Sequence, residues 1–192
     1  VCALDSTTVT VSLGLYPWAR FRPGMAGVKM HTQLDLRGSI PSFVHITPER
    51  DHDATFLDQI VPEPGAVYVM DRAYFSFARL HRLHRAGSFF VVRARDDFDF
   101  ARSSSQAHPD PRVCSDQLGH PANPVPRRFY PDILRRIRYL DPEQKQMLIF
   151  ATNLLDADAL DIAQIYRYRW QIELFFKWIK QHLRIRAFHG TT

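Results

Sequence analysis

The alternation of apolar and polar positions predicts several strands in the first part of the chain. Residues 1–13 are rich in Val, Thr and Leu, which favour extended backbone. The runs 27–36 and 40–47 are separated by a short polar turn, so we expect them to pair as a hairpin. Apolar residues at helical spacing then predict a short helix over 53–61, which Pro62 and Pro64 end.

A buried strand and a helix are expected next. Residues 66–70 form a continuous apolar run that ends at Asp71, and apolar positions at helical spacing follow until Gly87. Residues 89–92 predict a further strand. This order of elements is typical of a mixed sheet with helices packed against it, where polar groups at strand ends commonly form sites.

The pattern is lost between Asp96 and about Leu134. Three successive serines and the prolines at 109, 111, 121, 124, 126 and 131 interrupt any periodicity. We interpret this segment as an irregular insertion that leaves little that could pair as strands. Order returns with a strand over 147–152 and a single long helix from about Ala157 to Leu183.

The last predicted helix has a polar face beside its apolar one. Its polar residues are separated by three, four and seven positions, which places them within an arc of about 60°. They are Tyr166, Arg169, Glu173 and Lys180. Taken alone, the pattern also fits an ordinary surface helix in which Arg169 and Glu173 form an ion pair worth about 0.3–0.5 kcal/mol.

Composition narrows the class of protein only modestly. The chain has 192 residues, of which 45% are hydrophobic, so it can bury a sizeable core. The net charge of +5 suits an acidic polymer, although a solvated basic surface explains it equally well. Cys2 and Cys114 stand in no paired spacing, and no apolar run approaches the roughly 20 residues that span a bilayer. We therefore expect a cytoplasmic protein without a membrane segment.

Three segments carry a resemblance to a known family. The spacing Tyr166-x2-Arg169-x3-Glu173-x6-Lys180 resembles the YREK signature of DDE transposases of the insertion-sequence-four family, which have a ribonuclease H-like catalytic core. Residues 3–7 resemble the first block of that family, and residues 69–74 resemble its second block. The likeness covers nearly the whole chain except the stretch near 103–131, where the family has a β-rich insertion.

The resemblance implies a metal site. Asp5, Asp71 and Glu173 would be the catalytic carboxylates and would bind Mg²⁺, with Mn²⁺ as a substitute. Carboxylates are ligands that Mg²⁺ prefers, and two metal ions can activate the attacking oxygen and stabilise the leaving one. On local sequence alone, Asp5 could instead cap a turn and Asp71 could cap the following helix.

Residues near these carboxylates, most of them cations, are expected to contact DNA. The residues concerned are Tyr166, Arg169, Lys180 and Arg72. Along the helix after Asp71, three arginines form either a solvated face or a strip for the DNA backbone: Arg79, Arg82 and Arg85. Before the short helix, Asp51 and Asp53 flank His52 and are better explained as capping residues than as metal ligands.

The expected fold is α/β, a ribonuclease H-like mixed sheet flanked by helices, with an irregular or β-type insertion before the last strand and helix. Residues 1–95 would form the first part of the catalytic core, 96–146 the insertion and 147–192 the end of the core with the Glu-bearing helix. We expect the chain to be a fragment of a longer protein.

The expected function is metal-dependent cleavage and transfer of DNA strands during transposition of an insertion sequence. The partners would be double-stranded transposon ends and target DNA, bound by a homodimer in a synaptic complex at the bacterial nucleoid. Two alternatives remain open, namely a metal-dependent nuclease on the same fold and an inactive remnant that still binds DNA.

Overall fold

The structure, a computed structural model, describes residues 1–11, 20–22, 25–96 and 98–182. Its strands are β1 (Cys2–Val11), β2 (Arg20–Arg22), β3 (Met25–Asp35), β4 (Ile40–Pro48), β5 (Val67–Met70), β6 (Phe89–Arg93), β7 (Phe100–Gln106), β8 (Val113–Pro121), β9 (Leu134–Asp141) and β10 (Gln146–Thr152). Its helices are the 3-10 helices η2 (Asp53–Gln59) and η3 (Arg72–Tyr74), and the α-helices α1 (Phe77–Arg85), α2 (Pro124–Phe129), α3 (Ala159–Arg167) and α4 (Trp170–His182).

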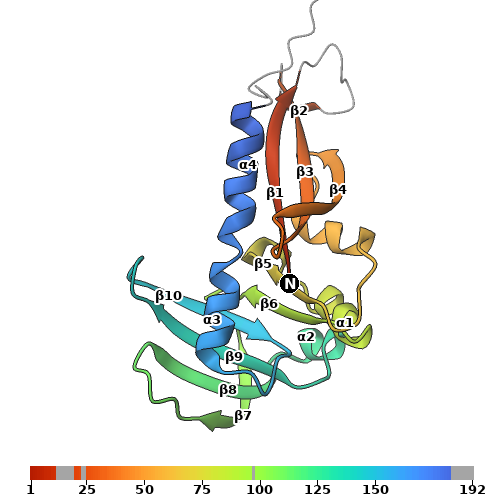
Figure 1. The fold of residues 1–192 in the computed structure, drawn as a ribbon. Coiled ribbons are helices and arrows are strands. Elements are labelled where there is room, and N and C mark those ends of the chain that lie inside the picture. The colour runs from red at the N-terminus through yellow and green to blue at the C-terminus, as the bar shows by residue number, and fades with distance from the viewer. Residues whose placement is uncertain (12–19, 23–24, 97, 183–192) are drawn as a thin grey trace, which may run out of the picture.

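The described strands form one mixed sheet of ten strands. Their order in space is β2, β3, β1, β5, β6, β10, β9, β8, β7, and β4 pairs with β3 outside this path (Figure 1). Strand β5 runs parallel to β1 and β6, whereas the other strand pairs are antiparallel. The fold is therefore a large, mostly antiparallel sheet flanked by helices, and the expected hairpin of β3 and β4 is confirmed.

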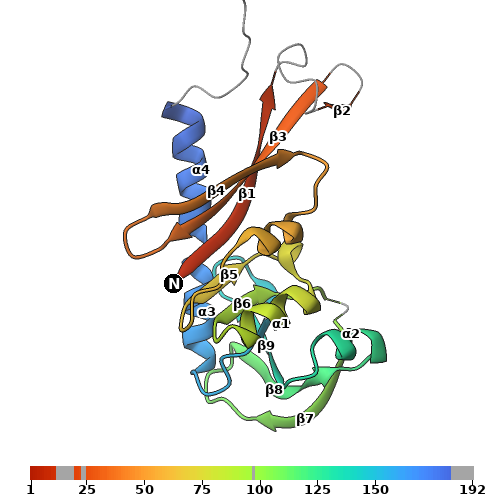
Figure 2. The same cartoon turned by 90° about the vertical axis from the view of Figure 1, so that its right-hand side faces the viewer.

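Helices cover the central strands on both faces, which explains why those strands are continuous apolar runs. Along β5, Tyr68 and Met70 pack in one core cluster with residues of η2 and α1, whereas Val69 packs with residues of α3 on the other face. Figure 2 shows η2 and α1 in front of the sheet and α3 and α4 behind it. Ala3 and Leu34 meet Ile172 on the α4 side.

The prediction that little between Asp96 and Leu134 could pair as strands is wrong. Strands β7, β8 and β9 pair in succession, and β9 continues the sheet next to β10. The prolines lie between strands, in α2 or at the end of β8, where they remove no ladder hydrogen bond from a strand interior. Gly119 is required on β8, because a Cβ atom there would lie 2.1 Å from the backbone oxygen of Ala101.

The single long helix predicted over 157–183 is also wrong, because the structure divides it into α3 and α4. Between them the amide of Arg169 donates to the oxygen of Tyr166, and the amide of Ile172 donates to that of Arg169. These bonds join residues three apart, so the backbone tightens into a 3-10 turn at this point. Leu183 lies outside the described residues.

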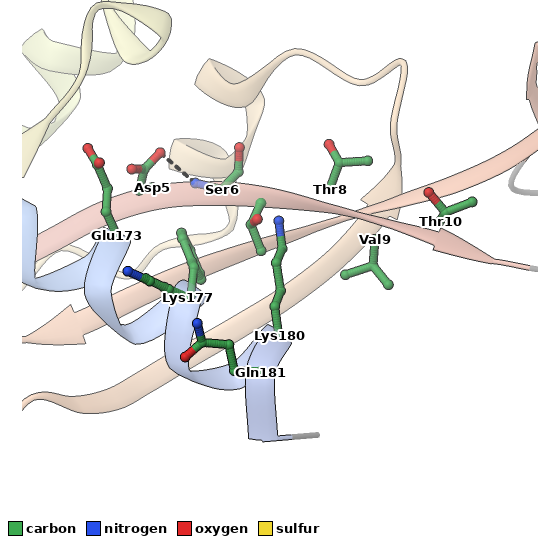
Figure 3. Close-up of a pocket in the computed structure, with 11 residues that line it drawn as sticks. Asp5, Ser6, Thr8, Val9, Thr10, Glu173, Lys177, Lys180 and Gln181 are labelled. Atoms are coloured by element: carbon green, nitrogen blue, oxygen red, sulfur yellow. Dashed lines mark hydrogen bonds between the residues drawn. The ribbon is translucent and has the colours of Figure 1, made fainter. Parts of the chain in front are cut away.

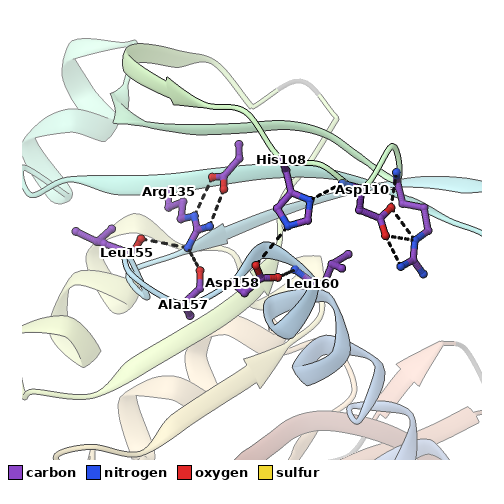
Figure 4. Close-up of polar contacts among 9 residues, drawn as sticks. His108, Asp110, Arg135, Leu155, Ala157, Asp158 and Leu160 are labelled. Carbon is purple, nitrogen blue, oxygen red and sulfur yellow. Dashed lines mark hydrogen bonds and ion pairs between the residues drawn. The ribbon is translucent and has the colours of Figure 1, made fainter.

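The inserted strands also fix the beginning of α3 (Figure 4). Arg135 on β9 forms two hydrogen bonds with Asp116 on β8, at 2.8 and 2.6 Å, and both side chains are buried. The same guanidinium donates to the backbone oxygens of residues 154, 155 and 157. Asp158 then caps α3 by accepting the amide of Leu160 at 2.8 Å. The insertion therefore helps to set where α3, and α4 after it, lie on the sheet.

Candidate active site

Two of the three predicted carboxylates belong to neighbouring parallel strands or to the residue directly after one. In the register of β1 and β5, Leu4 pairs with Met70; Asp5 is the next residue on β1, and Asp71 directly follows the end of β5. Neighbouring strands are about 4.8 Å apart, so both side chains start from adjacent positions. The sequence suggests that Asp5 lies near a strand end, but in the structure it lies within β1. The reason is that β1 continues along β3 to Val11.

Asp71 is at the N-cap position of η3 but does not cap it. Its side chain makes no capping hydrogen bond, and its Oδ1 atom is buried without a hydrogen-bond partner among the described residues. A buried, unpaired carboxylate oxygen costs free energy unless a ligand or water satisfies it. The structure therefore does not support the capping alternative for Asp71, and it leaves this oxygen available for a cation.

Arg169 joins the other two carboxylates. Its Nη1 atom lies 3.0 Å from Asp5 Oδ2, and its Nη2 atom lies 2.6 Å from Glu173 Oε1. The guanidinium is 12% exposed and lies 5.5 Å from the centre of the Tyr166 ring, which packs on Phe150 in the core. The 3-10 turn between α3 and α4 thus directs Arg169 to the carboxylates, and the ring of Tyr166 packs against its guanidinium.

The surroundings of the Asp5 carboxyl group disfavour its ionised form. Burial raises the pKa of Asp5 to about 6, although the Ser6 amide and Arg169 lower it, and the negative charges of Asp71 and Glu173 raise it further. The three acids are therefore within electrostatic reach of one another. A group that neutralised this charge would stabilise the folded protein.

The raised pKa of Asp5 predicts a pH dependence of stability in the absence of metal. The folded state holds the proton on Asp5 up to a pH of about 6, whereas the unfolded state loses it near 3.8. The Asp5 contribution to the free energy of unfolding should thus fall as the pH rises from about 4 to about 7, by at most about 1.4 kcal/mol per pH unit, and then level off.

This contribution can be isolated by difference. The melting temperature of the wild-type chain minus that of Asp5→Asn, measured in EDTA, should decrease between about pH 4.5 and about pH 7 and stay constant above. A difference that does not change with pH would contradict the raised pKa.

The three acids are not assembled as a metal site in this conformation. Among residues 1–11, 20–22, 25–96 and 98–182, no group of three His, Cys, Asp or Glu side chains is close enough to hold one ion. Arg169 provides the positive charge between Asp5 and Glu173 instead. The chemistry of the donor set, three carboxylates with one unpaired buried oxygen, nevertheless fits a hard divalent cation.

A groove with a volume of about 750 Å³ extends from Asp5 and Glu173 between β1 and α4 (Figure 3). The predicted Lys180 lines it, together with residues that the sequence analysis did not single out: Thr8, Thr10, Lys177 and Gln181. Lys177 follows Glu173 by four residues, so helical periodicity could have indicated it. Hydroxyl and ammonium groups along a groove can hold phosphates.

The remaining predicted DNA contacts differ in accessibility. Arg72 is exposed and lines a second hollow with Asp71 and Arg95, whereas Tyr166 is only 7% exposed and Arg169 is paired with two acids. Two of the three arginines on α1 contact the segment of η2. Arg79 forms a bidentate ion pair with Asp58, and Arg82 donates to backbone oxygens of η2 and its C-cap. These two arginines hold η2 and α1 together.

Comparisons with known proteins point to one family. The family model described as Transposase DDE domain matches residues 1–192. A protein of Geobacillus stearothermophilus described as a transposase for insertion sequence element IS5377 is 32% identical over 98% of this chain and 50% of its own length. One of Sinorhizobium fredii described as transposase y4zB is 31% identical over 97% and 53%. The chain thus spans about half the length of the curated relatives it matches.

Proposed function

The chain belongs to the family described as Transposase DDE domain, and from this premise we propose that it performs metal-dependent DNA cleavage and strand transfer during transposition of an insertion sequence. The observation that carries the proposal is the convergence of Asp5 and Glu173 on one guanidinium, with Asp71 directly after the end of the adjacent parallel strand. The spacing of Tyr166, Arg169, Glu173 and Lys180 supports the insertion-sequence-four family and a ribonuclease H-like core as the finer assignment.

Domains of this family generally use divalent metal ions, and we propose Mg²⁺, with Mn²⁺ as a substitute. Asp5, Asp71 and Glu173 would hold the ions, with the unpaired Oδ1 atom of Asp71 as one ligand. When bound, a pair of such ions activates the attacking oxygen and stabilises the leaving oxygen of a phosphodiester. The protein's own part is to gather the acids on a rigid sheet and helix.

The cations around the acids would position DNA. Lys180 and Lys177 line the groove, and Arg72 is exposed beside Asp71, so they can contact phosphates on either side of the acids. Arg169 would leave Asp5 and Glu173 when cations replace it and would then be free to meet a phosphate. Buried Tyr166 would support Arg169 through its ring rather than contact DNA.

The partners would be double-stranded transposon ends and target DNA, held by a homodimer in a synaptic complex. The division into a core over 1–95 and 147–192 with an insertion over 96–146 remains part of the proposal. Within the described ranges the helices are too short or too polar to cross a bilayer.

The direct test is nicking of duplex DNA by the chain in Mn²⁺, compared with its Glu173→Gln variant. We expect nicking by the wild type and none by the variant, because the amide removes one carboxylate ligand without changing side-chain size. Transfer of a pre-cut 3′ end into a second duplex would distinguish a transposase from a nuclease. DNA binding without cleavage in either metal would favour an inactive remnant and contradict the proposal.

A further inference from the structure

A second polar cluster lies behind Asp5, on the other face of the sheet. Asp5 faces α4, so its neighbour Ser6 points to the opposite side, where its Oγ atom donates to Asp53 Oδ1 at 2.7 Å. The Lys29 ammonium lies 3.2 Å from the same oxygen, and His31 Nδ1 lies 3.8 Å from it. We call these four residues, Ser6, Lys29, His31 and Asp53, the Asp53 cluster.

The Asp53 cluster is enclosed rather than solvated. The side chain of His31 is fully buried and stacks on Phe56 of η2 at 5.0 Å, while the side chains of Lys29 and Asp53 are 14% and 21% exposed. Burial lowers the pKa of His31 to about 4, so Lys29 is the cation that faces Asp53 at neutral pH. Because an ion pair removed from water contributes little net stability, stability alone does not explain the pairing of Lys29 with Asp53.

Asp53 does not have the capping role expected from the sequence. The structure has no side-chain capping bond at the N-cap of η2, His52, and the Asp53 carboxylate faces Ser6 and Lys29 instead. Contacts of Arg82 with backbone oxygens of Leu57 and Ile60 hold η2 in place. Asp53 is therefore presented to β1 from a fixed element.

Ser6 connects this cluster to the candidate active site. Its backbone amide donates to Asp5 Oδ1 at 2.8 Å, while its hydroxyl is bonded to Asp53. Asp5 Oδ1 is thereby fixed, and Oδ2 is the oxygen that meets Arg169. The Tyr74 side chain is buried, and burial first, and then the charges of Asp5, Asp53 and Asp71, raise the pKa of its hydroxyl.

We propose that Asp53 is a positioning residue for metal binding, which orients Asp5 through Ser6. By holding the Ser6 hydroxyl, Asp53 fixes the backbone amide that engages one oxygen of Asp5 and leaves the other oxygen for a divalent cation. This inference rests on the proposed function, because it requires that Asp5 bind metal. Partners of metal ligands typically contribute about 10-fold to 100-fold in metal affinity.

The test is Mn²⁺ affinity, measured by the loss of the free-ion signal in electron paramagnetic resonance, on variants shown to be folded by circular dichroism. Asp53→Ala removes the acceptor of the Ser6 hydroxyl, and Ser6→Ala removes the donor. Each should weaken Mn²⁺ binding about 10-fold or more, and the double variant should be no weaker than either single one. Asp53→Asn keeps an acceptor and should restore most of the affinity.

Asp51→Ala is the matched control, since it removes an acid two residues away whose contact with Lys29 is made by the backbone oxygen. It should bind Mn²⁺ as the wild type does. Wild-type affinity in folded Ser6→Ala and Asp53→Ala would overturn the inference alone, and Ser6→Ala decides the matter if Asp53→Ala does not fold. A wild-type chain that binds no Mn²⁺ would overturn the proposed function and this inference with it.

Discussion

Asp71→Asn should abolish metal-dependent nicking and at the same time stabilise the metal-free protein. The loss of activity should exceed the roughly 100-fold effect of removing an outer partner, because Asp71 is itself proposed as a ligand. The gain in stability is expected because Asp71 places a negative charge near Asp5, and its Oδ1 atom is buried without a partner. Nicking rates in Mg²⁺ and melting temperatures in EDTA measure the two effects.

Asp96→Asn provides the control for this experiment. Asp96 is exposed and lines the same hollow as Asp71, so its replacement removes the same charge from the same surface. It should change nicking little. Near-normal nicking by Asp71→Asn in Mg²⁺ would show that Asp71 is not a ligand, whatever its effect on stability.

Sequence patterns were sufficient for the central strands, where local and tertiary preferences agree. The run over 66–70 is apolar because β5 is covered on both faces, so its pattern alone predicts a buried strand. Gly87 ends the helical pattern after Asp71, and in the structure it has a φ of +76° just beyond α1. For β5 and for the end of α1, a few neighbouring residues are therefore sufficient to predict the local structure.

Strand β7 of the insertion could not be predicted from local sequence, because pairing rather than burial defines it. Six of the seven residues of β7 are exposed, so the strand has no apolar alternation to reveal it. Its pairing with β8 depends on the close approach that Gly119 allows. Such long-range pairing is invisible to periodicity.

The candidate site was predicted as a set of residues but not as an arrangement. Spacing placed Arg169 beside Glu173, but nothing local indicates its contact with Asp5, which is 164 residues away. The contact depends on the 3-10 turn between α3 and α4, where Arg169 ceases to follow the regular helix. Asp53 was assigned a capping role for the same reason, since its partner Ser6 lies 47 residues earlier.

Arg169→Ala should separate metal-free stability from metal binding. In EDTA the variant leaves the carboxylates of Asp5 and Glu173 without their shared cation, and a charged group deprived of its partner costs about 1–3 kcal/mol. Bound Mg²⁺ would take over that neutralisation, so the difference from the wild type should shrink as the ion is added. Because the ion no longer competes with a guanidinium, the variant should also bind Mn²⁺ more tightly.

The control for Arg169→Ala is Arg167→Ala, which removes an arginine two residues away. Arg167 is 42% exposed and pairs with Glu143 at the surface, where an ion pair is worth about 0–1 kcal/mol. Arg167→Ala should change the free energy of unfolding little in EDTA, and adding Mg²⁺ should not alter that difference. Unfolding in urea across a series of Mg²⁺ concentrations measures both variants. If Arg169→Ala lost the same stability at every Mg²⁺ concentration, Arg169 would be a structural anchor, and the carboxylates would not exchange it for metal.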